Sequence, residues 1–271
     1  MALDEDIGSG DVTSGYFVPE DRQAVAVAMV KAEGVIAGLE VAKKVYESVD
    51  PSLEVSLLME DGQRVRHGSK VMKIVGSARS ILTAERTSLN FLQRLSGVAT
   101  KTRSFVDAVK GTEAKVLDTR KTTPGWRYLE KAAVLAGGGV NHRMGLYDRA
   151  MVKDNHLVAE GGLERLQVAI DQLKDEKPDV EVELEVDTLD QLKNFLTLTG
   201  VDYILLDNMS NDELRKAVTM RNGLRPYLEA SGGVTLDTIQ AIAQTGVDYI
   251  SVGAVTHSAV ALDISLDFQA L

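Results

Sequence analysis

Basic residues follow two short β-rich runs in the second half of the chain. Arg120 and Lys121 follow Thr119 after the run at 114–118, and Lys153 ends the run at 149–153. In a β/α fold, ligand groups come from the carboxyl ends of the strands. Together with Arg143, these side chains would form a strongly positive pocket, because arginine and lysine bind carboxylates and phosphates. A solvated surface charge is the alternative for any one of them, but it explains all four together poorly.

Acidic residues occupy the neighbouring runs. VEVELEV (180–186) places Glu181, Glu183 and Glu185 on one face of a strand, and the next run ends in Asp207. An inward carboxylate needs a cation or a Lys or Arg partner. Glu185 and Asp207 could therefore hold Mg²⁺ through oxygen ligands. Salt bridges from these acids to Arg120, Lys121 or Lys153 are the alternative, and both arrangements can hold at once.

Glycines follow the last two β-rich runs, as SGG (231–233) and as Gly253. Backbone N–H groups at such positions, next to a helix start, form the phosphate site of many barrels. SGG alone is usually only a turn, so the prediction of a phosphate site depends on SGG and Gly253 occurring together. The loop GGGVNHR (137–143) can turn tightly where backbone approaches a ligand, and its His142 could bind or position an anion. A lone histidine is more often structural, so this role depends on its neighbours.

Short β-rich runs alternate with amphipathic patterns throughout the second half, which predicts βαβ units and a parallel sheet. The hexapeptide TGVDYI occurs at 199–204 and at 245–250, with two βα units between the copies, as in a barrel built from similar units. Six clear strands are too few for a complete eight-stranded barrel. The predicted strands are 114–122, 149–156, 180–186, 201–208, 227–233 and 247–254, and the predicted helices are 163–176, 188–196, 210–221 and 235–246.

The first hundred residues have a different, α+β pattern. A long helical stretch at 81–110, broken near Gly97, is expected to join the two parts. Strands are expected within 24–38, 53–65 and 70–76, and a helix is expected at 38–50.

The predicted fold class is therefore α/β. An N-terminal α+β open sandwich at 1–98 is followed by an incomplete, six- or seven-stranded β/α barrel at 99–271. The C-terminal tail could pack back on the first domain.

The composition narrows the class of protein. The 271 residues carry a net charge of −10 and no cysteine, which argues against a nucleic-acid binder and excludes disulfides and a cysteine nucleophile. No apolar run reaches the roughly 18 residues of a membrane span, and the acidic start has no apolar signal core, so we expect a cytoplasmic protein without a membrane partner. Residues 115–156 hold eight Lys or Arg against four Asp or Glu. This basic island either suits a small anionic ligand or is chance clustering.

The stretch DTRKTTPGWRYLEKAAVLAGGGVNHRMGLYDRAMVKDNH (118–156) resembles the central signature of the quinolinate phosphoribosyltransferase family. Similar segments cover nearly the whole chain: EDIGSGDVT (5–13), AEGVIAG (32–38), AERTSLNFLQRLSGVAT (84–100), VELEVDTLDQL (182–192), ILLDN (204–208), LEASGGV (228–234) and ISVGAVTHS (250–258).

The resemblance implies an N-terminal α/β sandwich, an incomplete barrel and a pentosyltransferase of de novo NAD biosynthesis. Such an enzyme converts quinolinate and phosphoribosyl pyrophosphate into nicotinate mononucleotide, pyrophosphate and CO₂, usually with Mg²⁺. It also implies self-association, as a homodimer or as a hexamer of dimers.

The resemblance further implies roles for individual residues. Quinolinate-binding residues would be Arg120, His142, Arg143 and Lys153, with Arg86 supplied by a neighbouring subunit. Lys121 would serve both substrates, and Glu185 and Asp207 would lie near the ribose and the metal. The catalytic group would thus be Lys121, Lys153, Glu185 and Asp207, and the segments near phosphate would contain Ser231, Gly232, Gly233 and Gly253.

Three other functions fit parts of the sequence. One is a related phosphoribosyltransferase for another base, such as the family member associated with molybdenum uptake. A second is a Schiff-base lyase that uses Lys121 or Lys153. The third is a sugar-phosphate binder without turnover, which the inward acids Glu185 and Asp207 argue against, because binding of anions needs no carboxylates.

Overall fold

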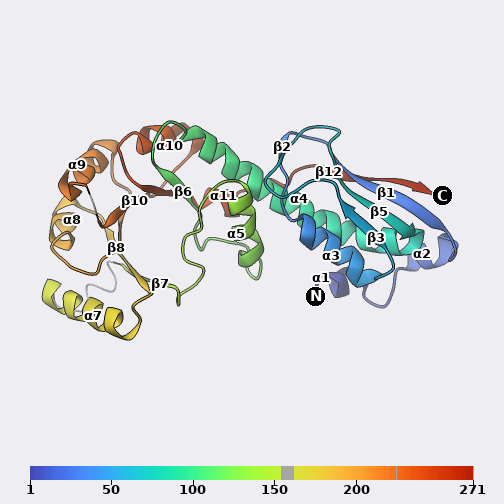
Figure 1. Ribbon diagram of the computed structural model, residues 1–271, viewed down its shortest axis with the longest axis horizontal. Helices are drawn as coiled ribbons and strands as arrows, with labels where there is room; N and C mark the ends of the chain where they lie inside the picture. Colours follow the sequence, from blue (N-terminus) through green and yellow to red (C-terminus); the bar gives the residue numbers. More distant parts are fainter. Residues whose placement is uncertain (154–161, 224, 271) are drawn as a thin grey trace. The chain divides into compact units, whose positions relative to one another are not determined.

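The computed structural model describes residues 1–153, 162–223 and 225–270 (Figure 1). These fall into two compact units. The first contains Met1–Arg103, Leu129–Gly138 and Ser258–Leu271, and the second contains Ser104–Tyr128 and Gly139–His257. Asp154, Asn155 and His156, which the sequence placed at a strand end, lie outside the described residues.

The first unit is built on an antiparallel sheet in the order β12-β1-β5-β3, as the α+β pattern predicted. Buried Ala24, Ala26 and Ala28 alternate along β1 with less buried residues, so one face of the sheet is apolar. Helix α3 contributes the fully buried Tyr46 to the same core. The strands are β1 (Gln23–Val30), β2 (Gly34–Val35), β3 (Glu54–Leu57), β4 (Arg64–Val65), β5 (Lys70–Ser77) and β12 (Ile264–Ala270), and the helices are α1 (Ala2–Ile7), α2 (Val12–Phe17) and α3 (Leu39–Val49).

Helix α4 (Ala78–Ala108) is continuous, so the predicted break near Gly97 is wrong. A Cβ atom on Gly97 would overlap the carbonyl oxygen of Val260, which lies against the helix in the same unit. The chain after residue 257 follows α4: Leu262 N donates to Gln93 O at 3.0 Å, and the side chains of Gln93 and Arg94 donate to the carbonyls of Ile264 and Ala259. The glycine is therefore needed for this close approach and not for a change of backbone direction.

The second unit contains six parallel strands in the order β6-β11-β10-β9-β8-β7, with β6 and β7 at the two edges. A single parallel bridge adds Val140 beside Leu117 of β6. The predicted incomplete barrel is confirmed. Helices α7 to α10 lie on the outside of these strands (Figure 1). The strands are β6 (Lys115–Leu117), β7 (Arg149–Val152), β8 (Glu181–Val186), β9 (Tyr203–Asp207), β10 (Tyr227–Ser231) and β11 (Tyr249–Ser251).

The helices of this unit begin where their sequence signals predicted. Thr188, Ser210 and Thr235 are N-cap residues, each within a capping box. The helices are α7 (Leu163–Glu176), α8 (Leu189–Phe195), α9 (Asn211–Arg221), α10 (Leu236–Ala243) and α11 (Ala254–His257), while α5 (Arg127–Ala136) has residues in both units.

The repeated hexapeptide has a structural role at the amino ends of the strands. Asp202 Oδ2 accepts hydrogen bonds from Val182 N at 2.9 Å and from Lys174 Nζ at 2.7 Å. Asp248 Oδ2 accepts in the same way from Leu228 N at 2.7 Å and from Arg221 at 2.6 Å. Each aspartate thus joins the neighbouring strand to a nearby helix, which sets the register of the sheet.

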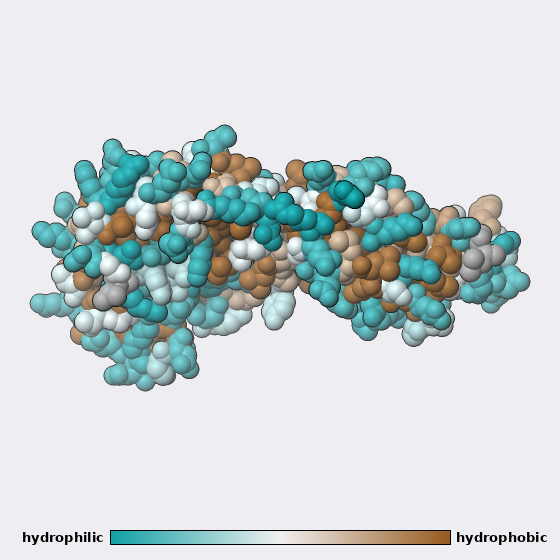
Figure 2. Space-filling view, turned by 45° about the horizontal axis from the view of Figure 1, so that its top comes forward, coloured by the Kyte–Doolittle hydropathy of each residue, from teal (hydrophilic) through white to brown (hydrophobic). Residues whose placement is uncertain are grey.

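Within the described residues, no helix is long and apolar enough to cross a membrane. On the face drawn in Figure 2, hydrophilic side chains dominate and hydrophobic ones form scattered patches.

Replacing Gly97 with alanine should lower the free energy of unfolding by about 1–3 kcal/mol, since the new methyl group overlaps backbone. Helix propensity alone predicts the opposite, a gain of about 1 kcal/mol. The matched control is Gly15→Ala in α2, where a Cβ would meet nothing within 4 Å. Urea denaturation of both variants tests the explanation, which is wrong if Gly97→Ala is as stable as the parent protein.

Candidate active site

A cavity of about 720 Å³ opens at the carboxyl ends of the parallel strands, and all its lining residues belong to the second unit. Its volume is in the range of small-molecule sites. The strand register explains why residues distant in sequence meet here, since Ser231 of β10 pairs with Asp207 of β9. The lining residues are Thr119, Arg120, Lys121, His142, Arg143, Met151, Lys153, Glu185, Leu205, Asp207, Asn208, Glu229, Ser231, Gly232, Gly233, Val234, Thr235, Ser251, Val252, Gly253, Ala254 and His257.

The structure brings together every site residue that the sequence suggested except one. Arg86 lies on α4 in the first unit, where its side chain is exposed, and it does not line the cavity. The other eleven line it: Arg120, Lys121, His142, Arg143, Lys153, Glu185, Asp207, Ser231, Gly232, Gly233 and Gly253.

The basic wall of the cavity is held by the loops that follow β6 and precede β7. Arg127 connects them, because its guanidinium donates to Thr122 Oγ1 at 3.1 Å and to Met144 O at 3.1 Å. The Nε atom of Arg120 is buried and has no hydrogen-bond partner among the described residues. Burial and the charge of Arg120 lower the pKa of Arg143. Both observations indicate a site in which positive charge awaits an anionic ligand.

The acidic wall contains Glu185 and Asp207. Lys153 Nζ lies 2.6 Å from Glu185 Oε2, so the salt bridge considered from the sequence is present. Asn208, in the left-handed region with φ 53°, donates to Asp207 Oδ2 at 2.7 Å. The carboxylate oxygens of the two acids line the same cavity, and this donor set fits a hard cation such as Mg²⁺.

A glycine-rich wall of the cavity lies beside these side chains. Gly232 has φ 99° and Gly233 has φ 58°, and a Cβ on Gly232 would overlap the side-chain oxygen of Asn208. A Cβ on Gly253 would lie 3.1 Å from Lys121 Cδ. Helix α10 starts just beyond, after its N-cap Thr235. Close backbone and a helix start are the elements of a phosphate site, and this role stays a prediction.

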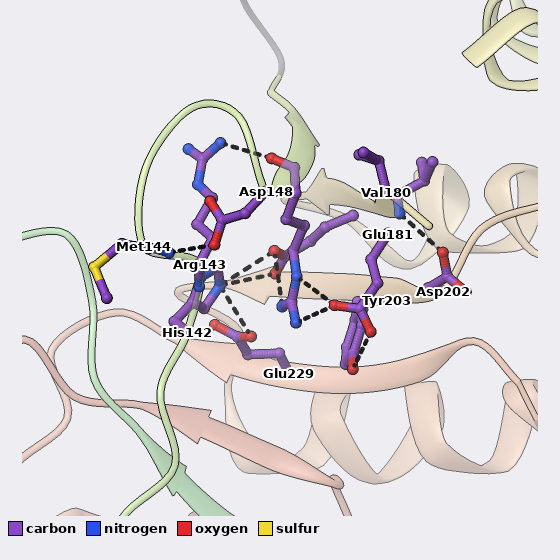
Figure 3. A network of polar contacts seen from close by, with 12 residues as sticks. His142, Arg143, Met144, Asp148, Val180, Glu181, Asp202, Tyr203 and Glu229 are labelled. Atoms are coloured by element: carbon purple, nitrogen blue, oxygen red, sulfur yellow. Dashed lines mark hydrogen bonds and ion pairs between the residues drawn. The ribbon is translucent and has the colours of Figure 1, made fainter. Parts of the chain in front are cut away.

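A buried cluster that the sequence analysis did not identify underlies the cavity as its floor. His142 and Glu229 line the cavity, and Figure 3 shows the polar contacts that join them to the residues behind. His142 Nε2 lies 3.1 Å from Glu183 Oε2 and 3.4 Å from Glu229 Oε2, and neither glutamate side chain has any exposed surface. Arg149 bonds to Glu181 at 2.6 Å and approaches Glu183 at 3.5 Å. Acidic residues within buried, otherwise apolar strands are the signal that could have revealed this cluster.

The two glutamates have opposite electrostatic environments. Burial by itself would raise the pKa of Glu183, but the hydrogen bond from His142 and the charge of Arg149 outweigh it and keep that pKa below its ordinary value. Burial raises the pKa of Glu229, and the neighbouring charge of Glu183 raises it further. Of the two, Glu183 is therefore the more readily ionised and Glu229 the more readily protonated.

His142 contacts protein groups through both ring nitrogens. The amide of Arg143 donates to its Nδ1 at 2.7 Å, and its Nε2 faces the glutamates. Its backbone N–H donates to Asp118 Oδ1 at 2.8 Å, and the bridge between Val140 and Leu117 places this loop beside β6. The ring is thus suited to holding the loop in position, and direct contact of His142 with a substrate stays a prediction.

Comparison with known families assigns both halves of the chain. The description "Quinolinate phosphoribosyl transferase, N-terminal domain" matches residues 11–96, and the corresponding C-terminal domain matches residues 98–267.

Individual relatives agree with this assignment. The chain is 46% identical to quinolinate phosphoribosyltransferase [decarboxylating] 2b, mitochondrial, of Nicotiana tabacum, over 98% of this chain and 80% of the relative. It is 44% identical to nicotinate-nucleotide pyrophosphorylase [carboxylating] of Mycobacterium leprae, over 98% and 94% of the two chains. A crystal structure of NadC from Streptococcus pyogenes superposes with a TM-score of 0.93 at 41% identity, covering 100% of this chain and 94% of the other.

Proposed function

This chain belongs to the quinolinate phosphoribosyltransferase family, and we propose that it transfers the phosphoribosyl group of phosphoribosyl pyrophosphate to quinolinate with loss of CO₂. The products are nicotinate mononucleotide, pyrophosphate and CO₂, in de novo NAD biosynthesis. The observation that carries the proposal is a single cavity in which four basic side chains face two carboxylates and a glycine-rich wall: Arg120, Lys121, Arg143, Lys153, Glu185 and Asp207.

Charge complementarity supports these substrates. Quinolinate carries two carboxylates, and its co-substrate carries a phosphate and a pyrophosphate. The unpartnered Nε of Arg120 and the closely spaced charges of Arg120 and Arg143 are offset when such anions bind. An arginine fork suits a planar carboxylate in particular.

The transfer step needs positioning and charge more than proton transfer. The bond from ribose C1 to the pyrophosphate oxygen breaks, and the quinolinate ring nitrogen forms the new bond to C1. Positive charge develops on the ribose meanwhile, and Glu185 or Asp207 can stabilise it. Basic side chains of the same cavity hold the two reactants together, which removes much of the entropic barrier.

Decarboxylation follows from the charge of the ribosylated ring. The bond between C2 and its carboxylate breaks, CO₂ leaves, and the electron pair stays on C2 beside the cationic nitrogen. C2 then takes up a proton. Lys153 Nζ lies 2.6 Å from Glu185 Oε2, and this contact directs the amine at a carboxylate and disfavours the alternative Schiff-base chemistry.

Purified protein mixed with quinolinate, phosphoribosyl pyrophosphate and Mg²⁺ should form nicotinate mononucleotide and CO₂, while nicotinate in place of quinolinate should not react. Arg120→Ala and Lys153→Ala should each lower kcat/KM by about 100-fold or more, since each removes a charged contact inside the cavity. Arg215→Ala, at an exposed pair with Asp212 on α9, is the control. Product from neither acid, with folded protein, would leave a related base or pure binding as the function.

We also propose that the enzyme uses Mg²⁺, with Glu185 and Asp207 as its protein ligands. Bound there, the ion would neutralise charge on the leaving pyrophosphate. Removing divalent ions with EDTA should abolish turnover and added Mg²⁺ should restore it. Asp207→Asn should raise the Mg²⁺ concentration needed for half-maximal rate, whereas Asp212→Asn on the surface of α9 should not. Full activity in EDTA would rule this proposal out.

We further propose that the active form is at least a homodimer in which the partner's Arg86 completes the site, as the family resemblance implies. The exposure of Arg86 in this chain is compatible with such a role. Arg86→Ala and Lys153→Ala should each be inactive alone. Mixed and reassembled, they should recover about a quarter of the parent activity, because half the dimers are then mixed and each has one intact site. No recovery, in mixtures shown to exchange subunits, would contradict a shared site.

A cytoplasmic location stays a prediction. The name of the tobacco relative places that protein in mitochondria, so location varies within the family.

A further inference from the structure

Glu229 is a buried carboxyl group whose contact with His142 Nε2, at 3.4 Å, does not amount to a well-formed hydrogen bond. It lies on β10, opposite Leu205 of β9 and Tyr249 of β11, and it is fully buried. Both of its carboxyl oxygens lack a hydrogen-bond partner in the part of the chain that the structure describes. A charged carboxylate in this position would be strongly disfavoured, so the group is stable there as a neutral acid.

The groups around Glu229 come from every element that meets the floor of the cavity. Glu183 of β8 raises its pKa, and the ring of His142 and the hydroxyl of Ser251 act in the opposite direction. Arg149 of β7 balances the charge of Glu183, and Asp118 holds the backbone of His142. Within this cluster, the charges of Arg149, Glu183 and Glu229 sum to zero if the cluster holds one proton beyond the one on Nε2 of His142.

That extra proton has two possible positions, Glu229 or Nδ1 of His142. The glutamates favour a charged ring and raise the pKa of His142 to about 9, although burial opposes this. The amide of Arg143 decides between the two positions, because it donates to Nδ1 at 2.7 Å and a proton there would face another N–H group. The proton accordingly lies on Glu229, and the ring carries its own proton on Nε2.

This arrangement also argues against a metal ion at the cluster. The ligand atoms of His142, Glu183 and Glu229 lie within 4.8 Å of one another, as they would around a metal. A metal-binding histidine, however, donates from its other ring nitrogen. Here that nitrogen accepts, so Nε2 keeps its hydrogen and cannot coordinate.

We propose that Glu229, as a neutral acid, is a positioning residue: with Glu183 it holds the ring of His142, which in turn fixes the backbone of Arg143 for binding the carboxylates of the substrate. Figure 3 shows the side chains of Glu229 and His142 pointing toward one another at the end of the network that runs through Glu181. The guanidinium of Arg143 is held at its other end by the carbonyl of Arg149 at 3.2 Å. Without the contact between Glu229 and His142, the backbone of the cavity-lining Arg143 is no longer fixed, although its guanidinium is still held.

The kinetic test rests on the proposed function. Glu229→Ala should raise KM for quinolinate about 10-fold, with a smaller change in kcat and in KM for phosphoribosyl pyrophosphate, since one buried contact behind one substrate is lost. Glu229→Gln, which is neutral and similar in shape, should recover most of that loss. Glu181→Gln is the control and should leave these parameters unchanged, because Glu181 contacts Arg149 of the same cluster but does not line the cavity.

The histidine test needs no substrate and separates failure of this inference from failure of the proposed function. In ¹⁵N NMR of the parent protein, assigned with His142→Gln, the His142 ring should carry its hydrogen on Nε2 alone. Glu229→Ala should change that signal, and Glu229→Gln should preserve it.

Three results would overturn the inference. The first is a Glu229→Ala variant whose His142 signal and KM for quinolinate are unchanged. The second is a Glu229→Gln variant whose KM for quinolinate is raised as much as in Glu229→Ala. The third is a stoichiometric metal ion that the purified parent protein contains and Glu229→Ala lacks. The glutamine variant keeps the test decisive if the alanine variant does not fold.

Discussion

The guanidinium of Arg149 is the interaction on which the interior of the barrel depends. It lies against the ring of Tyr203, 4.0 Å from its centroid, and it pairs with both Glu181 and Glu183 of β8. Without this cation, Glu183 would be a buried charge next to a second carboxyl group, which is a costly arrangement. With it, the acidic strand β8 can form part of the barrel sheet, with Glu183 fully buried, and Glu185 of the same strand can line the cavity.

The cavity separates two kinds of charge by depth. In its floor, Arg149 pairs with Glu181 and Glu183, while Arg120 and Arg143 lie close enough on its walls for the charge of Arg120 to lower the pKa of Arg143. The acids of the floor thus have a cation of their own, and the basic side chains of the walls face the cavity. This arrangement suits substrates that bring several negative charges, and the family assignment supplies such substrates.

Loop geometry places these walls as much as the strands do. Positive φ at Gly232 and Gly233 lets the backbone turn beside Asn208, and the bridge at Val140 carries His142 and Arg143 to the cavity edge. At the opposite ends of the strands, Asp202 and Asp248 repeat the same pair of bonds. One sequence repeat therefore stabilises the sheet at one end, while the variable loops at the other end carry the chemistry.

The sequence by itself determined the local features. Strand runs, capping residues such as Ser210, and the charged residues after each strand are all encoded within a few neighbouring positions, and the structure confirms the incomplete barrel they predict. Two other features depend on the tertiary structure alone. In the sequence, Gly97 predicts a helix break, and only the position of the Val260 carbonyl against the helix explains the glycine. His142, Glu183 and Glu229 become one cluster because strand order makes neighbours of residues more than 40 positions apart, and no local pattern encodes that pairing.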